Sequence, residues 1–171
     1  YPQDGDDYGI YAQRYNADGS ANGDEFQVNT YTENGQWRPS TTALSDGGFV
    51  ITWDSIEQDG SYNGVYAQRY NADGSANGDE FQVNTYTQNG QGGPSTTALN
   101  DGGFVITWFS EYQDNEYTFT YEASYEIFAQ RYDAEGNALG EVTLNALPAL
   151  SSAISDASTN EDAAYSYDAS S

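Results

Sequence analysis

The feature of this sequence that most limits its possible folds is an internal repeat with a period of 55 residues. The segment Tyr11–Thr32 recurs unchanged as Tyr66–Thr87, and the similarity continues to Trp53 and Trp108. A looser third copy, FAQRYDAEGNALGEVTLNA, begins at Phe128. Such a period is typical of repeat architectures, in which each unit needs neighbours to bury its apolar side. A surface that occurs more than once favours a scaffold or multivalent binder over an enzyme. The closest two copies differ at Glu33/Gln88, Trp37/Gly92, Arg38/Gly93 and Ser45/Asn100.

Composition excludes several classes of function. The 171 residues include 27 acidic and only four basic side chains, all arginine, for a formal net charge of −23. Nucleic acid and anionic membrane surfaces are therefore poor partners, because both need clustered cations. Cysteine, histidine and methionine are absent, so disulfides, thiolate nucleophiles and imidazole bases are excluded. No apolar run reaches the length of a membrane helix.

The chain reads as short β-strands separated by turns, with no sustained helical period before its last residues. In the first complete unit we expect strands at about 40–44, 48–54, 64–70 and 80–86. The Asp-Gly pair in SDGG predicts a hairpin between the first two strands. FVITW is nearly all apolar, which predicts a strand buried on both faces. The alternating YAQRY and FQVNTY predict strands with one packed and one solvated side.

These strands group into a half unit (1–33) and two whole units (34–88 and 89–145), with roughly ten strands in total. We therefore predict an all-β fold of antiparallel four-stranded repeat units, arranged like propeller blades or as stacked sheets. Propellers usually close with four to eight blades, more than this chain provides. The alternatives are a fragment of a larger propeller, a ten-stranded sandwich or barrel, or units completed by strands of a neighbouring chain. Residues 146–171 are rich in Ser and Ala and read as a linker or the start of another module.

The repeat PSTTALSDGGFVITW … GVYAQRYNADGSANGDEFQVNT resembles the tandem repeats of very large bacterial surface or secreted proteins, of the calcium-dependent, type I-secreted adhesin kind. The likeness covers about 3–145. The tail DASTNEDAAYSYDAS resembles the first strand of a dystroglycan-type cadherin-like module. The resemblance implies extracellular placement, calcium binding and a structural or adhesive role. The glycine-rich nonapeptide that binds calcium in such proteins is absent from this chain, so calcium binding through that motif is not implied.

The loop NADGSANGDE occurs twice and is the strongest metal candidate, because alternating oxygen ligands are what calcium loops provide. It differs from an EF-hand loop, since Ala21 and Ala76 stand where glycine is expected. The alternative is a solvated hairpin whose Asn and Asp side chains cap their own turn. The acidic cluster QDGDD at 3–7 is a second calcium candidate. The candidate ligands in the two loops are Asn16, Asp18, Ser20, Asn22 and Asp24, and Asn71, Asp73, Ser75, Asn77 and Asp79.

Three tryptophans are candidate ligand-binding residues. Trp53 and Trp108 end the apolar strands, where they could stack on a sugar ring or pack in the core. Trp37 has no counterpart in the other copy and lies beside Arg38 in an expected loop, which favours an exposed contact.

The arginines of the AQRY segments occupy the same place in each copy. They could grip carboxylates of a neighbouring subunit or an acidic glycan. The other interpretation pairs each arginine with an acid of its own sheet while its stem covers a tyrosine ring. These residues are Arg14, Arg69 and Arg131.

We expect an extracellular or cell-surface, structural or adhesive segment of a larger bacterial protein, without enzymatic activity. Its open sheet edges suggest assembly into fibres by strand complementation, with copies of itself or adjacent modules as partners. A carbohydrate-binding module of the propeller-lectin type, with glycans as partners, is the alternative. A calcium-stiffened spacer without adhesive function is a third hypothesis. Neither nucleic acid binding nor membrane insertion is expected. The sequence begins within a repeat, which suggests a piece of a longer protein.

Overall fold

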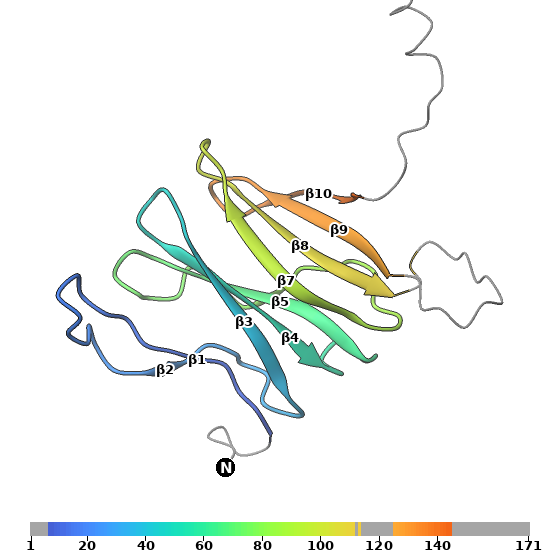
Figure 1. Ribbon diagram of the computed structural model, residues 1–171, viewed down its shortest axis with the longest axis horizontal. Coiled ribbons are helices and arrows are strands. Elements are labelled where there is room, and N and C mark those ends of the chain that lie inside the picture. The colour runs from blue at the N-terminus through green and yellow to red at the C-terminus, as the bar shows by residue number, and fades with distance from the viewer. Residues whose placement is uncertain (1–6, 112, 114–124, 145–171) are drawn as a thin grey trace, which may run out of the picture.

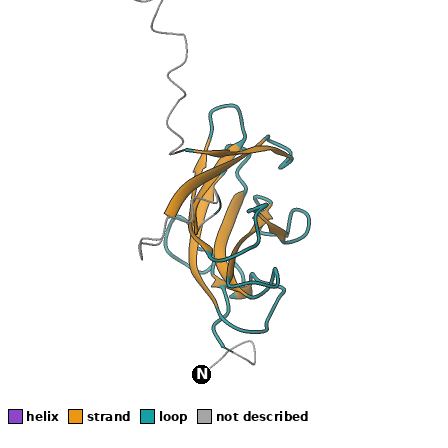
Figure 2. Cartoon of the chain, turned by 90° about the vertical axis from the view of Figure 1, so that its right-hand side faces the viewer, coloured by secondary structure: helices purple, strands orange, loops and turns teal. Residues whose placement is uncertain are grey.

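A computed structural model describes residues 7–111, 113 and 125–144 of the chain. This part is all-β, with antiparallel sheets of two, four and four strands that do not close into a barrel. Figures 1 and 2 show strands and connecting loops, with no helix in the described part. The predicted fold class is therefore confirmed, and the barrel alternative is wrong. The tail 146–171 and most of the QDGDD cluster lie outside the described residues.

Each sheet joins its strands in chain order, as hairpin after hairpin. We call the three sheets unit 1, unit 2 and unit 3. Unit 1 contains β1 (Tyr11–Ala12) and β2 (Phe26–Gln27). Unit 2 contains β3 (Gln36–Ala43), β4 (Phe49–Ile56), β5 (Asn63–Tyr70) and β6 (Phe81–Gln82). Unit 3 contains β7 (Gln91–Ala98), β8 (Phe104–Glu111), β9 (Tyr125–Tyr132) and β10 (Ala138–Thr143).

The SDGG turn between β3 and β4 is the tight hairpin that its sequence predicts. The Leu44 amide donates to the Gly48 carbonyl at 2.8 Å, and Gly47 has a φ of 85°. Glycine adopts this left-handed conformation without steric cost. The Asp46 carboxylate accepts the Gly48 amide at 2.8 Å, which closes the turn. The predicted strand at 80–86 is shorter in the structure, where β6 spans two residues.

The units follow one another in space in the same order as in the chain, with β1–β2 at one end and β9–β10 at the other (Figure 1). The first strand of unit 3, β7, lies against β3, β4 and β5 of unit 2. We call the side of a unit that packs on the following unit its forward face, and the side that packs on the preceding unit its rear face. On β5, Val65, Ala67 and Arg69 lie on the forward face, and Tyr66 and Tyr70 lie on the rear face.

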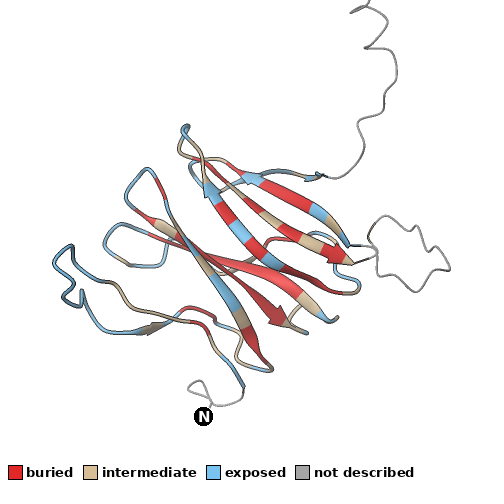
Figure 3. Ribbon diagram, in the orientation of Figure 1, coloured by how far each residue is buried: buried red, intermediate tan, exposed pale blue. Residues whose placement is uncertain are grey.

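The sequence FVITW occurs in both β4 and β8, but the two strands are buried differently (Figure 3). In β4 every residue from Val50 to Ser55 is buried, as predicted for a strand with two covered faces. In β8 buried and half-buried residues alternate, and the prediction is wrong there. The predicted one-sided burial of YAQRY is also wrong for β5, which is buried almost throughout. Units on both sides cover unit 2, whereas unit 3 has a described neighbour on one side only.

Candidate functional site: the junctions between units

Two hydrophobic clusters form the core, and each lies between two units rather than inside one. The first joins Ile10 and Val28 of unit 1 to Trp53 and Tyr70 of unit 2. The second joins the forward face of unit 2, including Val65 and Val83, to residues of unit 3. A single antiparallel sheet cannot bury its apolar faces alone, so packing against neighbours is the main source of stability here. The unit 3 residues of the second cluster are Phe104, Ile106, Trp108, Phe128 and Tyr132.

The two junctions use the same aromatic contacts. Phe26 of unit 1 packs on Tyr70 of unit 2 with a centroid distance of 5.3 Å and tilted rings. Phe81 of unit 2 packs on Tyr132 of unit 3 in the same way, at 5.5 Å. Tilted aromatic pairs at this spacing add to the free energy of simple burial. Repeated sequence therefore produces a repeated interface.

In units 1 and 2 a buried asparagine holds the last segment of the unit and connects it to the next unit. In unit 2 the Asn84 side-chain oxygen accepts the Val65 amide at 2.7 Å. The Asn84 amide nitrogen donates to the Tyr86 carbonyl at 2.8 Å and to Gln91, at the start of β7, at 3.2 Å. Asn29 makes the equivalent bonds to Ile10, Tyr31 and Gln36. Buried polar groups need hydrogen-bond partners. Each asparagine side chain provides them for backbone groups of its own unit and for a glutamine side chain of the next unit.

Arginine side chains reach from one unit into a loop of the next. Arg14 donates to the carbonyl oxygens of Ala72 and Asp73 in the β5–β6 loop. Arg69 donates to the Ala134 carbonyl, in the β9–β10 loop, at 2.9 Å. The Arg69 guanidinium also lies 5.6 Å from the centre of the Phe104 ring of unit 3, within the range of a cation–π contact.

These contacts differ from the predicted pairing of each arginine with an acid of its own sheet. That pairing is correct for Arg131, which binds Asp101 of its own unit. It is secondary for Arg69, whose distance to Asp46 is 4.0 Å. The physical reason is that a neighbouring unit brings a turn of unpaired carbonyls within reach of the guanidinium. At Arg131 the described residues provide no such neighbour.

A glutamate on each following unit accepts a backbone amide from the preceding one. The Thr30 amide donates to Glu80 at 2.7 Å, and the Thr85 amide donates to Glu141 at 3.0 Å. Both bonds involve a charged acceptor, which makes them stronger than bonds between neutral groups. Neither these glutamates nor the buried asparagines were predicted from the sequence. The available signal was the recurrence of Asn29 as Asn84 and of Glu25 as Glu80, whereas Glu141 is displaced by one residue in the third copy.

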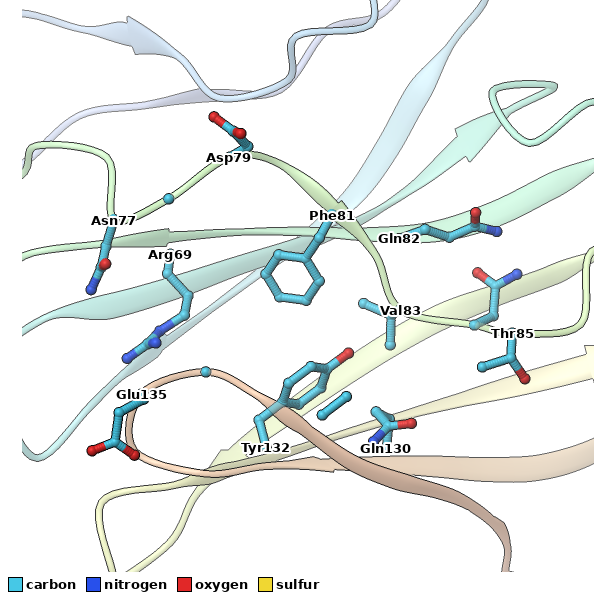
Figure 4. Close-up of a pocket in the computed structure, with 14 residues that line it drawn as sticks. Arg69, Asn77, Asp79, Phe81, Gln82, Val83, Thr85, Gln130, Tyr132 and Glu135 are labelled. Carbon is cyan, nitrogen blue, oxygen red and sulfur yellow. The ribbon is translucent and has the colours of Figure 1, made fainter.

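A groove of about 460 Å³ opens between the forward face of unit 2 and the rear face of unit 3 (Figure 4). Arg69 extends along it toward the loop that carries Glu135, and the rings of Phe81 and Tyr132 lie beside each other. Its walls are the paired residues of the junction itself. Arg69, Asn84 and Thr85 of its lining are hydrogen-bonded across the junction, so the groove is part of the contact between the two units.

Among the described residues Asp54, near the end of β4, is the only acidic side chain that is buried, and it lies at this junction. It accepts the Gly93 amide of unit 3 at 2.9 Å and the Arg38 guanidinium of its own unit at 3.1 Å. Burial raises the pKa of Asp54 to about 6, although the Gly93 amide and Arg38 both favour the charged form. Unit 3 has Phe109 at the equivalent position, packed beside the glycines that replace Trp37 and Arg38. Two of the four substitutions between the copies, Trp37/Gly92 and Arg38/Gly93, therefore lie beside the Asp54/Phe109 difference.

The predicted calcium loops adopt the self-capped conformation that was the alternative interpretation. Asp73 accepts the amide and hydroxyl of Ser75, and these bonds lower the pKa of Asp73. Asn71 donates to the same hydroxyl at 3.0 Å. The first loop repeats this arrangement. Among the described residues, three acidic side chains do not come together at any point that could hold a metal ion. Calcium binding by these loops stays a prediction.

The three candidate tryptophans occupy two kinds of place. Trp53 and Trp108 are completely buried in the hydrophobic clusters, so their rings are core residues, inaccessible to a sugar in this arrangement. Trp37 is half-buried, and its ring lies 6.5 Å from that of the exposed Tyr8. Both line a shallow, mainly apolar groove with Tyr11.

Comparisons of the chain with protein-family models, curated proteins and solved structures found no match. In the part of the chain that the structure describes, no helix could span a membrane.

Proposed function

We propose that this chain is a structural and adhesive segment of a larger extracellular protein, built from blade-like units that dock in series. The observation that carries the proposal is the repetition of one docking interface at two successive junctions. At each junction an arginine binds a loop, a glutamate binds a threonine amide, and an aromatic ring packs on a tyrosine. A repeated interface of this kind extends an array without creating the asymmetric cavity that catalysis requires.

The junctions make each unit dependent on its neighbour. The core lies between sheets, so separation of two units would expose Trp108 or Trp53 to water. An array stabilised by nearest-neighbour interfaces holds its exposed side chains at fixed spacing. This rigidity supports a role as a spacer that presents binding surfaces. The strongly acidic composition and the likeness to bacterial surface repeats support the extracellular placement.

Unfolding experiments test whether the units act as one structural element. We expect one cooperative transition in urea when tryptophan fluorescence and far-UV circular dichroism are compared. Arg69→Ala should move that transition to lower urea, because it breaks the junction between units 2 and 3. Arg131→Ala is the matched control, since it removes the same charge from a half-exposed side chain whose ion pair with Asp101 lies within unit 3. Separate transitions for the two signals in the wild-type chain would contradict serial coupling.

The half-buried Trp37 favours carbohydrate binding as a second candidate function. Its ring, with Tyr8 and Tyr11, forms an aromatic groove of the kind on which sugar rings stack. Glycan-array binding that is lost in Trp37→Gly would support it. The Gly92 of unit 3 shows that the repeat folds with glycine at this position, so the variant should retain its structure. Absence of binding to every glycan tested would remove this candidate.

A further inference from the structure

The forward face of unit 3 exposes apolar side chains that the repeat buries elsewhere. Ile127 is 42% exposed, whereas Val65, its counterpart in unit 2, is 0% exposed. Leu144 is 55% exposed, against 3% for its counterpart Val83. Val142, the counterpart of Phe81, is also exposed. In units 1 and 2 the following unit covers these positions, so the face has the chemistry of a docking surface that no following unit covers within the described part of the chain.

Arg131 marks the polar part of the same face. On β9 it lies two register positions beyond Ala129 and four beyond Ile127, and it pairs with Val105 of β8. Its side chain is half exposed and contacts the exposed Asp101. Arg69, by comparison, is buried and donates to the Ala134 carbonyl of the next unit. Arg131 therefore has the position of the inter-unit arginines without a following loop among the described residues.

The opposite end of the molecule carries the part of the complementary surface that β1, β2 and their loop provide. Among the described residues, unit 1 has no counterpart of β4, whose Trp53 contributes to this face in unit 2. The β1–β2 loop of unit 1 has the same NADG sequence as the loop that receives Arg14. A Cβ at Gly74 of that loop would overlap Arg14, but the equivalent space at Gly19 is open. Tyr15 is 66% exposed, whereas its counterpart Tyr70 is 6% exposed and holds Phe26. The rear face of unit 1 thus offers the ring and the carbonyls that a forward face binds.

We propose that two copies of this chain dock head to tail, with the forward face of unit 3 on the rear face of unit 1 of a second copy. Arg131 binds the carbonyl oxygens of Ala17 and Asp18 of that copy, and Val142 packs on its Tyr15. The inference rests on the proposed serial docking and extends it from within one chain to between chains. The contact is heterologous, because different surfaces meet, and it can propagate.

A second copy of the chain suits this face because the interfaces inside the chain already join such faces in series. The residues on both surfaces occupy the same repeat positions as residues that meet at the two internal junctions. Strand addition to an open edge would instead use backbone groups, and would not depend on Arg131. The net charge of −23 opposes association at low ionic strength, so docking should strengthen as salt is added.

Sedimentation velocity across a range of concentrations and salt tests the proposal, with variants that disable one surface each. Leu144→Asp with Arg131→Ala disables the forward face, and Tyr15→Ser disables the rear face. All three side chains are largely exposed, so the substitutions should leave the fold intact, which circular dichroism checks. Arg38→Ala and Tyr62→Ser are matched controls on exposed residues elsewhere. Each disabled variant should associate at least about tenfold more weakly than the wild type, whereas the controls should not.

Mixing the two disabled variants gives the sharpest result. Each retains one intact surface, so the mixture should form a one-to-one complex that neither variant forms alone. Wild-type chain that stays monomeric at every concentration would overturn the proposal and leave serial docking within the chain intact. Association that persists in both variants, or a mixture that does not form the complex, would also overturn it.

Discussion

The buried carboxylate at the junction between units 2 and 3 gives a quantitative test of the structure. Asp54 has a pKa raised from 3.8 to about 6, mainly because burial disfavours its charged form. Each pKa unit corresponds to about 1.4 kcal/mol, so the charged form costs the folded state about 3 kcal/mol at neutral pH. Asp54→Asn removes the charge and keeps an oxygen that accepts the Gly93 amide. We therefore expect this variant to be more stable than the wild type at neutral pH.

The pH dependence has a definite sign. An acid with a higher pKa in the folded state binds its proton more tightly there. Its favourable contribution to the free energy of unfolding is therefore complete below pH 3.8. That contribution is lost as the pH rises to about 6. Ionisation of Asp54 lowers the free energy of unfolding by about 1.6 kcal/mol at pH 5 and by about 3 kcal/mol at pH 7.5. The advantage of Asp54→Asn over the wild type should therefore grow by about 1.4 kcal/mol between these two pH values.

Urea unfolding of both proteins at pH 5 and pH 7.5, followed by tryptophan fluorescence, measures this difference. Comparison with the wild type at each pH removes the contributions of the many other acids. Asp24→Asn, which neutralises an exposed carboxylate, is the control for the change in net charge. If the variant is less stable than the wild type at pH 7.5, or its advantage is the same at both pH values, the argument from burial is refuted.

Four further substitutions and one titration test other parts of the structure. In urea melts, Val50→Ala should lower the free energy of unfolding by about 2 kcal/mol, because Val50 is buried in β4. Val105→Ala should lower it by less than about 1 kcal/mol, because the same repeat position is half-buried in β8. Asn84→Ala should cost about 3 kcal/mol or more, since it leaves the Val65 amide unpaired in the core. Glu57→Gly should raise the melting temperature, because Glu57 has a φ of 57°, a conformation that costs a residue with a side chain about 1 kcal/mol. If the two NADGSANGDE loops bind calcium in the native state, the melting temperature should rise with calcium and fall with chelator; no change would exclude that prediction.

The strands and turns of this fold could be predicted from the sequence because their signals are local. The Asp-Gly turn at Asp46 and the strand expected at about 40–44 need only neighbouring residues to be interpreted. The period of 55 residues also indicated serial units. The roles of Asn84 and Glu80 could not be predicted, since each depends on a partner in another unit. The repeat showed which residues occupy equivalent positions in each copy. It did not show which surface of one copy contacts the next copy.

The two FVITW strands show why burial is a property of position in the array as well as of sequence. Identical residues at Val50 and Val105 have different exposure because only the first has a described unit on both sides. The substitutions between copies follow the same logic: Asp54 faces Gly93 across a covered junction, whereas Phe109 lies on the uncovered forward face of unit 3. A phenylalanine beside Ile127 extends the apolar surface there, and a carboxylate at that place would have interrupted it. The last described unit thus has a more apolar forward face than unit 2. This is the change expected of a surface that docks on another unit, whereas a unit that ends an array has a polar outer face.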